Sequence, residues 1–542
     1  MDYDVVIVGG GCSGLSTAIR LKDNAAKHNL DLSVCVLEKG ESIGSHVMSG
    51  CLMDTRALSL LIPNWKDLDS PIQQKVKKES MRFLLGQENS FSVPSLLIPK
   101  NMRHTESYIV SLSNVCRWLA TIAEEKGVDI FPDTPASALL YKDDKVEGVI
   151  TADKGVDKNG KPKEDFQRGY ALHSKFTVLA EGVLGSLTED VSRRFHLQRE
   201  QRTYGLGIKE IWDIPGSDSL VGTVVHTLGY PLQRSFHDPL YGGGFLYAES
   251  PSRVHIGYIT GLDYANPRLS PFEEFQLFKQ TEFVASLLRR GERMEYGART
   301  IYEGGELGRL VESFPGGVLV GEAMGAMNMA SLQGVDNSIA SGVMAADTIC
   351  DVLEEKEDMG YGERLRRSEM VKRLRRSRSL RAMFQKGLLC GMTYAWVCGT
   401  LLGDHNLITH HIEKGEDWER MKSLKEAEDR EYTKPDGVVS FDRVNSLSLS
   451  CIDYPQDSLP HLQVKKGMEE IPYDISYNVF GGPEEFFCPA HVYEYVTTKD
   501  GKVQFQIHSE NCLHCKTCVA KTPKGFIQWN VPSSGGPNYS NM

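Results

Sequence analysis

The chain begins with an apolar segment that leads directly into a glycine-rich turn. Residues 5–8 read Val-Val-Ile-Val, and residues 9–14 read Gly-Gly-Gly-Cys-Ser-Gly. Apolar residues at helical spacing follow from Leu15, and a second mostly apolar segment, 33–37, ends at Glu38. A strand, a tight glycine turn, a helix and a second strand in this order predict a β–α–β unit with parallel strands. No other feature restricts the possible folds of this chain as strongly.

The three spaced glycines of this turn form a dinucleotide-binding fingerprint. Gly9 permits the tight turn, Gly11 lets the backbone approach a pyrophosphate, and Gly14 allows the helix to pack closely on the strand. The start of the helix offers unpaired N–H groups to phosphates. Glu38 is placed to accept hydrogen bonds from a ribose. The motif alone does not choose between NAD and FAD, and a purely structural glycine turn is the alternative.

Two later strands favour FAD over NAD. Each is apolar and ends in a glycine next to a carboxylate. The strands and their ends are 176–180 with Glu181 and Gly182, and 317–320 with Gly321 and Glu322. Because open α/β sheets bind ligands beyond the carboxyl ends of their strands, we expect both ends to meet the first glycine loop. Glu322 would then suit a ribityl hydroxyl, although a routine strand-to-helix turn is the alternative at each place.

Four of the 12 cysteines gather near the end of the sequence. They are Cys488, Cys512, Cys515 and Cys518. Four thiolates are the usual ligand set of one [4Fe–4S] cluster, and a triple with two intervening residues wraps one loop around a cluster face. Structural zinc more often uses two separate Cys-x2-Cys pairs, so the spacing favours the cluster over zinc.

Composition excludes several other classes. Of the 542 residues, 41% are hydrophobic and 25% charged, which rules out collagenous, disordered and disulfide-scaffold chains. The net charge of −11 argues against a nucleic-acid binder, and no uncharged apolar run reaches the length of a spanning helix. Since the first apolar run starts at Asp4, we expect no signal or transit sequence and reduced thiols rather than disulfides.

A flavin and an iron–sulfur cluster in one chain imply electron transfer between one- and two-electron carriers. At this point a wider resemblance can be recognised, because the chain resembles the electron transfer flavoprotein–ubiquinone oxidoreductases along almost its whole length. The stretches that carry the resemblance are 36–39 (Val-Leu-Glu-Lys), 226–232 (His-Thr-Leu-Gly-Tyr-Pro-Leu), 241–247 (Tyr-Gly-Gly-Gly-Phe-Leu-Tyr), 261–267 (Gly-Leu-Asp-Tyr-Ala-Asn-Pro), 296–299 (Tyr-Gly-Ala-Arg), 434–437 (Lys-Pro-Asp-Gly), the cysteine triple and 535–542 (Gly-Gly-Pro-Asn-Tyr-Ser-Asn-Met).

The resemblance implies an oxidoreductase with FAD, one [4Fe–4S] cluster and a ubiquinone site. Electrons would arrive from reduced electron transfer flavoprotein and leave to ubiquinone, giving ubiquinol. The family's quinone-contacting pair maps to Gly242 and Gly243, where bare backbone allows close approach to a carbonyl; a glycine-rich turn is the alternative. The family is monotopic, on the matrix face of the mitochondrial inner membrane or the inner face of the bacterial cytoplasmic membrane. No side chain is expected to act as a catalytic acid or base.

The fold class expected from these patterns is α/β, or α+β overall, with four parts. A Rossmann-type FAD-binding domain interleaves with a quinone and membrane domain, and a ferredoxin-like [4Fe–4S] domain closes the chain. The expected boundaries are 1–50 with 128–200 and 295–360 for FAD, 51–127 with 201–294 for quinone and membrane, 361–435 for a helical segment with a basic stretch, and 436–542 for the cluster.

Three positions depart from the family pattern. The usual Gly-x-Gly-Pro-Ala-Gly has Cys12-Ser13 in place of Pro-Ala, with all three glycines kept. Glu322 stands where the family usually has cysteine. Residues 328–334 read Asn-Met-Ala-Ser-Leu-Gln-Gly in place of Asn-Val-Pro-x-Ile-Lys-Gly. Because that segment should run near the flavin, the loss of its proline and lysine bears on the flavin potential and the quinone fit.

Three apolar segments are candidates for membrane contact, and a basic one for lipid headgroups or an acidic partner. The apolar segments are 57–65, 83–99 and 387–403, each too short to span a bilayer. The basic segment is 364–381. Buried core is the alternative for the apolar segments, and a solvated helix face for the basic one.

Two rival functions are compatible with parts of this pattern. A geranylgeranyl-reductase-like flavoenzyme, reducing isoprenoid double bonds, would share the FAD fold and an apolar pocket. The 241–244 loop and the cluster cysteines favour the quinone reaction instead. A non-catalytic respiratory subunit is the other rival, and the intact glycines and all four cysteines argue against it.

Overall fold

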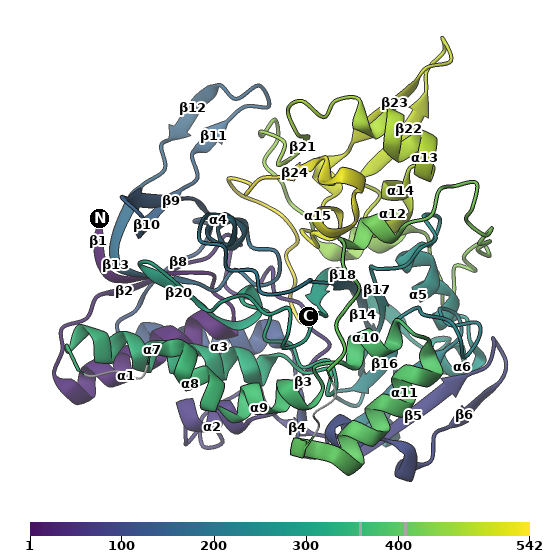
Figure 1. Ribbon diagram of the computed structural model, residues 1–542, viewed down its shortest axis with the longest axis horizontal. Coiled ribbons are helices and arrows are strands. Elements are labelled where there is room, and N and C mark those ends of the chain that lie inside the picture. Colours follow the sequence, from purple (N-terminus) through teal and green to yellow (C-terminus); the bar gives the residue numbers. More distant parts are fainter. Residues whose placement is uncertain (357–359, 406–408) are drawn as a thin grey trace.

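The computed structural model describes residues 1–356, 360–405 and 409–542, and its first large element is a mostly parallel sheet (Figure 1). Along the sheet the strands follow the order β19-β20-β13-β1-β2-β8, and antiparallel β10 and β9 are attached at β13. The five strands from β20 to β8 are parallel, as the β–α–β pattern predicts. The bounds are β1 Asp2–Val8, β2 Val34–Leu37, β8 Asp129–Phe131, β9 Ala136–Lys142, β10 Lys145–Thr151, β13 Ala171–Leu179, β19 Ser313–Phe314 and β20 Gly317–Leu319.

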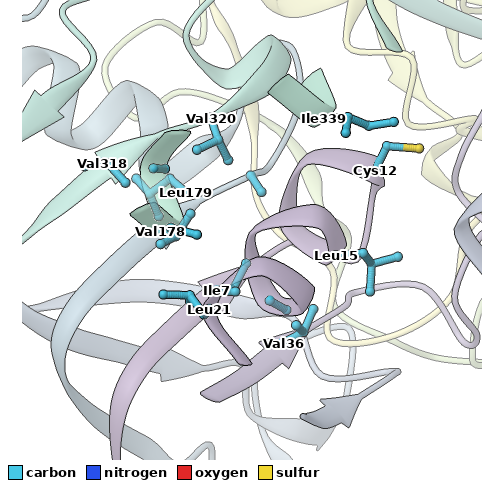
Figure 2. Packing of buried hydrophobic residues seen from close by; sticks show 14 of the residues in the cluster. Ile7, Cys12, Leu15, Leu21, Val36, Val178, Leu179, Val318, Val320 and Ile339 are labelled. Atoms are coloured by element: carbon cyan, nitrogen blue, oxygen red, sulfur yellow. The ribbon is translucent and has the colours of Figure 1, made fainter. Parts of the chain in front are cut away.

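Three helices cover this sheet and form its core, namely α1 (Cys12–His28), α3 (Leu112–Glu125) and α7 (Val335–Leu353). Figure 2 shows side chains from α1 and α7 packed against strand residues. Ile7, Leu15, Val36 and Ile339 are fully buried there. The helix α1 ends where Asn29 adopts a left-handed conformation and its N–H bonds to the carbonyl of Ala25.

A second sheet of seven strands stands beside the first. Its order is β18-β14-β17-β16-β15-β5-β6, with every pair antiparallel except β15 and β5. One face is covered by α5 (Pro271–Lys279) and α6 (Glu282–Leu288), and the three phenylalanines of α5 are completely buried. The strands are β5 Lys78–Leu84, β6 Ser90–Ser92, β14 Tyr204–Asp213, β15 Thr223–Gly229, β16 Gly242–Ala248, β17 Arg253–Gly261 and β18 Glu292–Tyr302.

The last fifth of the chain forms a small module on the outer side of β18 (Figure 1). Tyr296 donates its hydroxyl hydrogen to the carbonyl of Pro489 at 2.8 Å, and the N–H of Thr300 bonds to the carbonyl of Cys515 at 3.0 Å. Its strands form two antiparallel pairs, β21 with β24 and β22 with β23. The elements are β21 Leu462–Val464, β22 Tyr493–Thr497, β23 Val503–Ile507, β24 Ile527–Trp529, α12 Arg443–Leu447, α13 Asn478–Phe480, α14 Pro483–Phe487 and α15 Thr517–Lys521.

Short helices and strands complete the fold. Among the described residues, none of the helices combines the length and the apolar character that crossing a membrane requires. The remaining helices are α2 Arg56–Leu61, α4 Ser186–Arg194, α8 Tyr361–Arg367, α9 Glu369–Arg376, α10 Leu380–Phe384 and α11 Leu388–Trp396, with a π-helical turn at Val397–Leu402; the remaining strands are β3 Leu52–Met53, β4 Gln74–Lys75, β7 Tyr108–Ile109, β11 Lys154–Val156 and β12 Pro162–Gln167.

The membrane prediction for 57–65 is wrong. Leu58 and Leu61 of α2 are buried in the core around the first sheet, and Trp65, which would have been an interfacial anchor, is 2% exposed. The ring of Trp65 packs edge-on against Tyr108, and its N–H donates to the Ser59 hydroxyl at 3.0 Å. The apolar residues of this segment recur at helical spacing because they pack inward, which is the alternative that the sequence left open.

The basic segment 364–381 is largely paired within the protein. Arg373 bonds to Asp336, and Arg381 lies in a buried pair with Asp263 and Glu303. Exposed members pair with neighbouring glutamates on their own helices, as Arg367 does with Glu363. These pairs give the segment's charge an intramolecular role and leave little of it to attract lipid headgroups.

Candidate functional site

A cavity of about 710 Å³ lies between the two large sheets. Its wall includes the first glycine loop and residues of β14, β16 and β18. Five predicted site residues line it: Gly11, Gly182, Gly242, Gly243 and Glu322. The volume is in the usual range for a cofactor site. The cavity therefore brings together segments that lie hundreds of residues apart in the sequence.

The three fingerprint glycines have different surroundings. A Cβ on Gly9 would lie 2.4 Å from the carbonyl oxygen of Ala180, and one on Gly14 would lie 2.1 Å from the carbonyl oxygen of Gly9. Gly11 lines the cavity, and a Cβ added to it would meet no atom within 4 Å. Gly9 and Gly14 are thus required by packing, whereas Gly11 leaves room beside the start of α1 for a phosphate group.

Glu38 stands at the end of β2, directly behind the glycine loop, and is 8% exposed. Its Oε2 accepts the N–H of Gly10 at 2.9 Å, and its Oε1 accepts the N–H of Gly40 at 2.7 Å. Each carboxylate oxygen has a second lone pair. The side chain is therefore fixed in place and still able to accept a hydrogen bond from a ribose hydroxyl.

The carboxylate of Glu181 is engaged within the protein. Its Oε2 accepts hydrogen bonds from the backbone N–H and the hydroxyl of Thr188, at 2.7 and 2.8 Å. The carboxylate thereby caps α4, where a negative charge is stabilised by the free N–H groups of the first turn. The adjacent Gly182, with a positive φ of 74°, lines the cavity instead.

Glu322 presents an unpaired oxygen to the cavity. Its Oε1 is buried and has no hydrogen-bond partner among the described residues, and burial raises the pKa of the carboxyl to about 8, opposed by the charge of Arg202. Buried polar atoms are almost always satisfied in a functional state. The preceding Gly321 has a positive φ of 60° and packs against Ser13. An orphaned oxygen here, with the space at Gly11, fits the hydroxyls and phosphates of FAD.

The glycines of 242–244 lie at the other side of the cavity, at the start of β16. A Cβ on Gly242 would be 2.1 Å from the carbonyl oxygen of Ile259, and one on Gly243 would be 2.2 Å from that of Thr227. The N–H of Gly244 donates to the Thr227 hydroxyl at 3.0 Å. Close strand packing alone thus requires glycine here, and the same bare backbone forms part of the cavity wall.

The four clustered cysteines are buried next to one another, with 5–8% of each residue exposed. None is in a disulfide. Burial and the nearby Cys515 together raise the pKa of the Cys488 thiol to about 11, and burial with Cys515 and Cys488 raises the pKa of the Cys518 thiol to about 12. In this apolar site the thiolate form becomes favourable only beside a positively charged partner, and iron bound by four thiolates supplies that charge, so the donor set fits a [4Fe–4S] cluster.

Hydrogen bonds reach two of these sulfur atoms. The backbone N–H of His514 donates to Sγ of Cys512 at 3.4 Å, and the hydroxyl of Thr517 lies 3.4 Å from Sγ of Cys515. Hydrogen bonds to cluster sulfurs favour the reduced, more negative state and so raise the reduction potential.

A polar layer between the cysteines and the first glycine loop was not foreseen from the sequence. Lys39 contacts the Nδ1 atoms of His46 and His514 at 2.9 and 3.0 Å, and Arg299 donates to the carbonyl of His514 at 3.1 Å. Burial lowers the pKa of Lys39 to about 7. Lys39 and Arg299 both stand in stretches that carry the family resemblance, which was the available signal. Their proximity to His514 could only come from the tertiary fold.

Lys209 is a second cation that the sequence did not single out. It lies on β14 and lines the cavity, although it is only 1% exposed. Its Nζ donates to the carbonyl of Ser49 at 2.8 Å, and burial lowers its pKa to about 8. Lys209 lies in a strand of mostly apolar residues, so the sequence around it did not indicate a site.

Residues 328–334, whose sequence differs from the family pattern, form a tight turn in the cavity wall. Asn328 and Gln333 exchange backbone hydrogen bonds at 3.0 and 3.3 Å, and Leu332 has a positive φ of 52°. Gln333 also donates from its amide to the hydroxyl of Ser107 at 2.8 Å. These contacts hold the turn without the proline and lysine of the family pattern.

The outer end of the cavity opens among exposed apolar side chains. The hairpin of β5 and β6, the following turn and α11 all contribute to this apolar rim. Phe91 (46% exposed), Leu97 (54%) and Leu389 (52%) line the cavity. Leu85 (61%), Leu96 (76%) and Leu401 (65%) are exposed on the same elements and on the π-helical turn that follows α11, and we include them in the apolar rim. Monomeric proteins rarely expose so many large apolar side chains together unless the surface has a partner or a membrane to contact.

Comparison with known families and proteins agrees with this arrangement. Residues 4–91 match a family described as FAD dependent oxidoreductase, residues 204–301 match "ETF-QO, ubiquinone-binding", and residues 437–540 match "Electron transfer flavoprotein-ubiquinone oxidoreductase, 4Fe-4S". A solved structure described as geranylgeranyl bacteriochlorophyll reductase-like, from Thermoplasma acidophilum, is similar with a TM-score of 0.54 at 16% identity, over 73% of this chain and 90% of that chain. That similarity concerns the fold alone.

Full-length relatives are much closer. The chain is 40% identical to an electron transfer flavoprotein-ubiquinone oxidoreductase from Pseudomonas aeruginosa, over 100% of this chain and 99% of the relative. Mitochondrial proteins of the same description are 40% identical in Caenorhabditis elegans and 38% identical in Bos taurus, covering 100% of this chain and 92% and 89% of the relatives.

Proposed function

The chain belongs to the electron transfer flavoprotein–ubiquinone oxidoreductase family, and we propose that its cavity is where electrons from reduced electron transfer flavoprotein reach ubiquinone. The reaction is an oxidoreduction that uses FAD and a [4Fe–4S] cluster and produces ubiquinol. One observation carries the proposal: the cavity joins the first glycine loop to Gly242 and Gly243 and opens at the apolar rim.

We assign FAD to the inner part of this cavity. Gly11 and the start of α1 would hold the pyrophosphate, Glu38 the adenosine ribose and Glu322 a ribityl hydroxyl. Gly182 and Gly321 have no side chain, so the cofactor could approach their backbone atoms closely. Gly9 and Gly14 would keep the glycine loop packed against its neighbouring strand. When bound, FAD and the cluster supply exchange between single-electron and two-electron transfer.

The protein's own contribution is electrostatic and steric. Cys488, Cys512, Cys515 and Cys518 would hold the cluster, and their surroundings exclude water. Arg299 and Lys39 place positive charge between these cysteines and the glycine loop. Positive charge there stabilises the added electrons on either side of it. The apolar wall of the cavity keeps water from the reacting groups.

We assign the quinone ring to the part of the cavity next to Gly242 and Gly243, and its isoprenoid tail to the outer opening. The apolar rim would then sit in one leaflet of a membrane, a monotopic attachment. By this proposal the membrane is the matrix face of the mitochondrial inner membrane, or the cytoplasmic face of a bacterial inner membrane. Mitochondrial and bacterial relatives both support this class of location.

The domain assignment follows the same division of labour. We propose that 1–50, 128–200 and 295–360 bind FAD, that 51–127 and 201–294 bind quinone and membrane, and that 436–542 carry the cluster, with 361–435 as the helical connection. The two large sheets and the module next to β18 support this division.

The test uses purified protein with both cofactors. Reduced electron transfer flavoprotein should drive reduction of a short-tailed ubiquinone, and the protein should show flavin absorbance and a cluster signal by electron paramagnetic resonance. Cys518→Ser should abolish the cluster signal and most of the activity while flavin content stays unchanged, because its sulfur is a ligand. Cys451→Ser is the matched control, because Cys451 is exposed and lies outside the cluster. A wild-type protein with both cofactors but no quinone reduction would contradict the proposal and favour the reductase of isoprenoid double bonds.

A further inference from the structure

Glu79, His104 and His226 form a cluster at the edge of the cavity that the electron path does not use. Glu79 lies on β5 and His226 on the neighbouring strand β15, while His104 comes from the loop before β7. Their carboxylate and imidazole atoms lie within 4.8 Å of one another. His104 has both ring nitrogens in hydrogen bonds, so the cluster is not a free metal site.

The two ring nitrogens of His104 contact different partners. Its Nδ1 lies 2.5 Å from Oε1 of Glu79, and its backbone N–H donates to Oε2 of the same carboxylate at 2.9 Å. Its Nε2 lies 2.6 Å from the carbonyl oxygen of Ser331. Because a carbonyl can only accept, Nε2 carries a hydrogen, and the proton between Nδ1 and Glu79 can reside on either partner. His104 can therefore take a proton on one side while it holds one on the other.

The same cluster connects solvent with the cavity. The side chain of Glu79 is 11% exposed, whereas that of His104 is 1% exposed. The ring centroids of His104 and His226 are 5.3 Å apart, and one nitrogen of each ring lies within 4.8 Å of the other, a distance that one water can bridge. His226 in turn lies 2.8 Å from the hydroxyl of Tyr247, and both line the cavity.

From this geometry we infer that Glu79 and His104 form the entry of a proton path that ends at His226 and Tyr247 in the quinone part of the cavity. The inference rests on the proposed function, because it is quinone reduction that consumes protons. Forming one quinol takes two electrons from the cofactors and two protons, one at each carbonyl oxygen. We assign one of these protons to this path: it leaves the His226–Tyr247 pair, is replaced through His104 from Glu79, and Glu79 regains its own from solvent.

The environment suits such a path. Burial lowers the pKa of His226 to about 3, with a smaller contribution from the charge of His104. Its ring is therefore neutral, and it relays a proton by releasing one from one ring nitrogen as the other nitrogen takes one up. Other titratable groups near the inner end are Cys51, which raises the pKa of Tyr247, and Lys209, whose charge acts on Cys51. In the described part of the chain, neither Cys51 nor Lys209 forms a hydrogen bond or an ion pair with Glu79 or His104.

Glu79 and His104 act through His226, which makes them positioning residues, and their test needs a readout of proton transfer. The photoreduced holoenzyme is mixed with a short-tailed ubiquinone in detergent, and the return of flavin absorbance is followed over a range of pH, in H2O and in D2O. Glu79→Gln keeps the shape and hydrogen-bonding capacity of the side chain but cannot carry the proton. We expect its reoxidation rate to fall by about tenfold or more, most strongly at alkaline pH, with a larger solvent isotope effect.

Two further measurements separate proton transfer from structure. Quinone affinity, measured by calorimetric titration of the oxidised enzyme, should be unchanged in Glu79→Gln, and formate should restore part of its rate because Glu79 is partly exposed. Glu249→Gln is the matched control: Glu249 pairs with fully buried His255 at 3.0 Å on β17, outside the cavity wall. We expect this variant to reoxidise at the wild-type rate.

The outcomes are distinct. A wild-type enzyme that ubiquinone does not reoxidise would contradict the proposed function itself. A wild-type enzyme that is reoxidised, with Glu79→Gln unchanged in rate, pH profile and isotope effect, would overturn the proton path alone. A slower Glu79→Gln without formate rescue or an altered isotope effect would also overturn it, and would assign the pair to holding Ser331 in place. His104→Gln repeats the test at the second residue. If His104→Gln does not fold, the results for Glu79→Gln alone decide between these outcomes.

Discussion

The two ends of the central cavity are built on opposite principles. At the inner end, Gly9 and Gly14 have backbone atoms so close that a single added carbon would clash at 2.4 and 2.1 Å. At the outer end, Leu96 and Leu401 are 76% and 65% exposed. The inner end admits almost no change of shape, whereas the outer end is defined by its apolar character.

This difference follows from what each end has to hold. A dinucleotide is held by backbone N–H groups and a few fixed carboxylates, so the inner end depends on atoms placed to within tenths of an ångström. A bilayer is fluid and has no fixed shape, so the outer end needs only apolar area. Four substitutions, ordered from the largest expected effect to the smallest, would break or sharpen the comparison.

Gly14→Ala should have the largest effect. Its Cβ would lie 2.1 Å from the carbonyl oxygen of Gly9, so the helix and strand must separate. We expect little folded protein, or a loss of stability at or above the roughly 1–3 kcal/mol typical of overpacked cores. Thermal unfolding of the apoprotein measures it. Gly11→Ala is the control: its Cβ meets nothing within 4 Å, so the apoprotein should keep its Tm while flavin content falls.

Glu322→Gln should change the pH dependence of stability. The ordinary carboxyl pKa of 4.5 is raised to about 8 in the folded protein, so the native state holds a proton that the unfolded chain releases between these values. The stability of the apoprotein is therefore fully present below pH 4.5 and falls as pH rises to 8, by about 5 kcal/mol at most.

Urea unfolding of the apoprotein at several pH values checks this prediction. Glu322→Gln should flatten the decline, because the amide has no proton to lose. Glu125→Gln, at the exposed end of α3, should leave the wild-type pH profile in place. An equal slope in wild type and Glu322→Gln would mean that the carboxyl titrates normally.

Leu96→Gln should weaken binding to phospholipid vesicles without changing Tm. Burying a leucine is worth about 1.5–3 kcal/mol, so a residue that is 76% exposed in the free protein should account for about tenfold in the partition coefficient. Co-sedimentation with vesicles measures it. Val444→Gln is the control, since Val444 is 68% exposed but lies in the cluster module. Equal losses of vesicle binding in both variants would show that the apolar rim contacts the membrane no more than the cluster module does.

Arg367→Gln should have the smallest effect. Arg367 is held by Glu363 at 2.6 Å on its own helix, and exposed pairs of this kind contribute about 0–1 kcal/mol. Vesicle binding should therefore match wild type at low salt. A loss of about 1 kcal/mol, the usual contribution of a basic residue at an anionic surface, would show that the basic segment contacts headgroups after all.

Local patterns predicted those parts of the fold and site that depend on neighbouring residues. The run 5–8 and the glycines that follow can only form a strand and a tight turn, and the structure contains both. The four cysteines could be grouped from spacing alone, because three lie on one loop. The 57–65 segment was misjudged, since periodicity describes an apolar face but not what covers it.

The sequence by itself determined the strand and glycine turn of residues 5–14 and which four sulfurs gather near the end of the chain, because these patterns lie among residues close in sequence. Only the tertiary structure decided that Glu181 caps a helix, that Lys39 meets His514, and that Glu79 contacts His104. The physical reason is that hydrogen bonds and burial act over a few ångströms in space, and folding brings those partners together from distant parts of the chain.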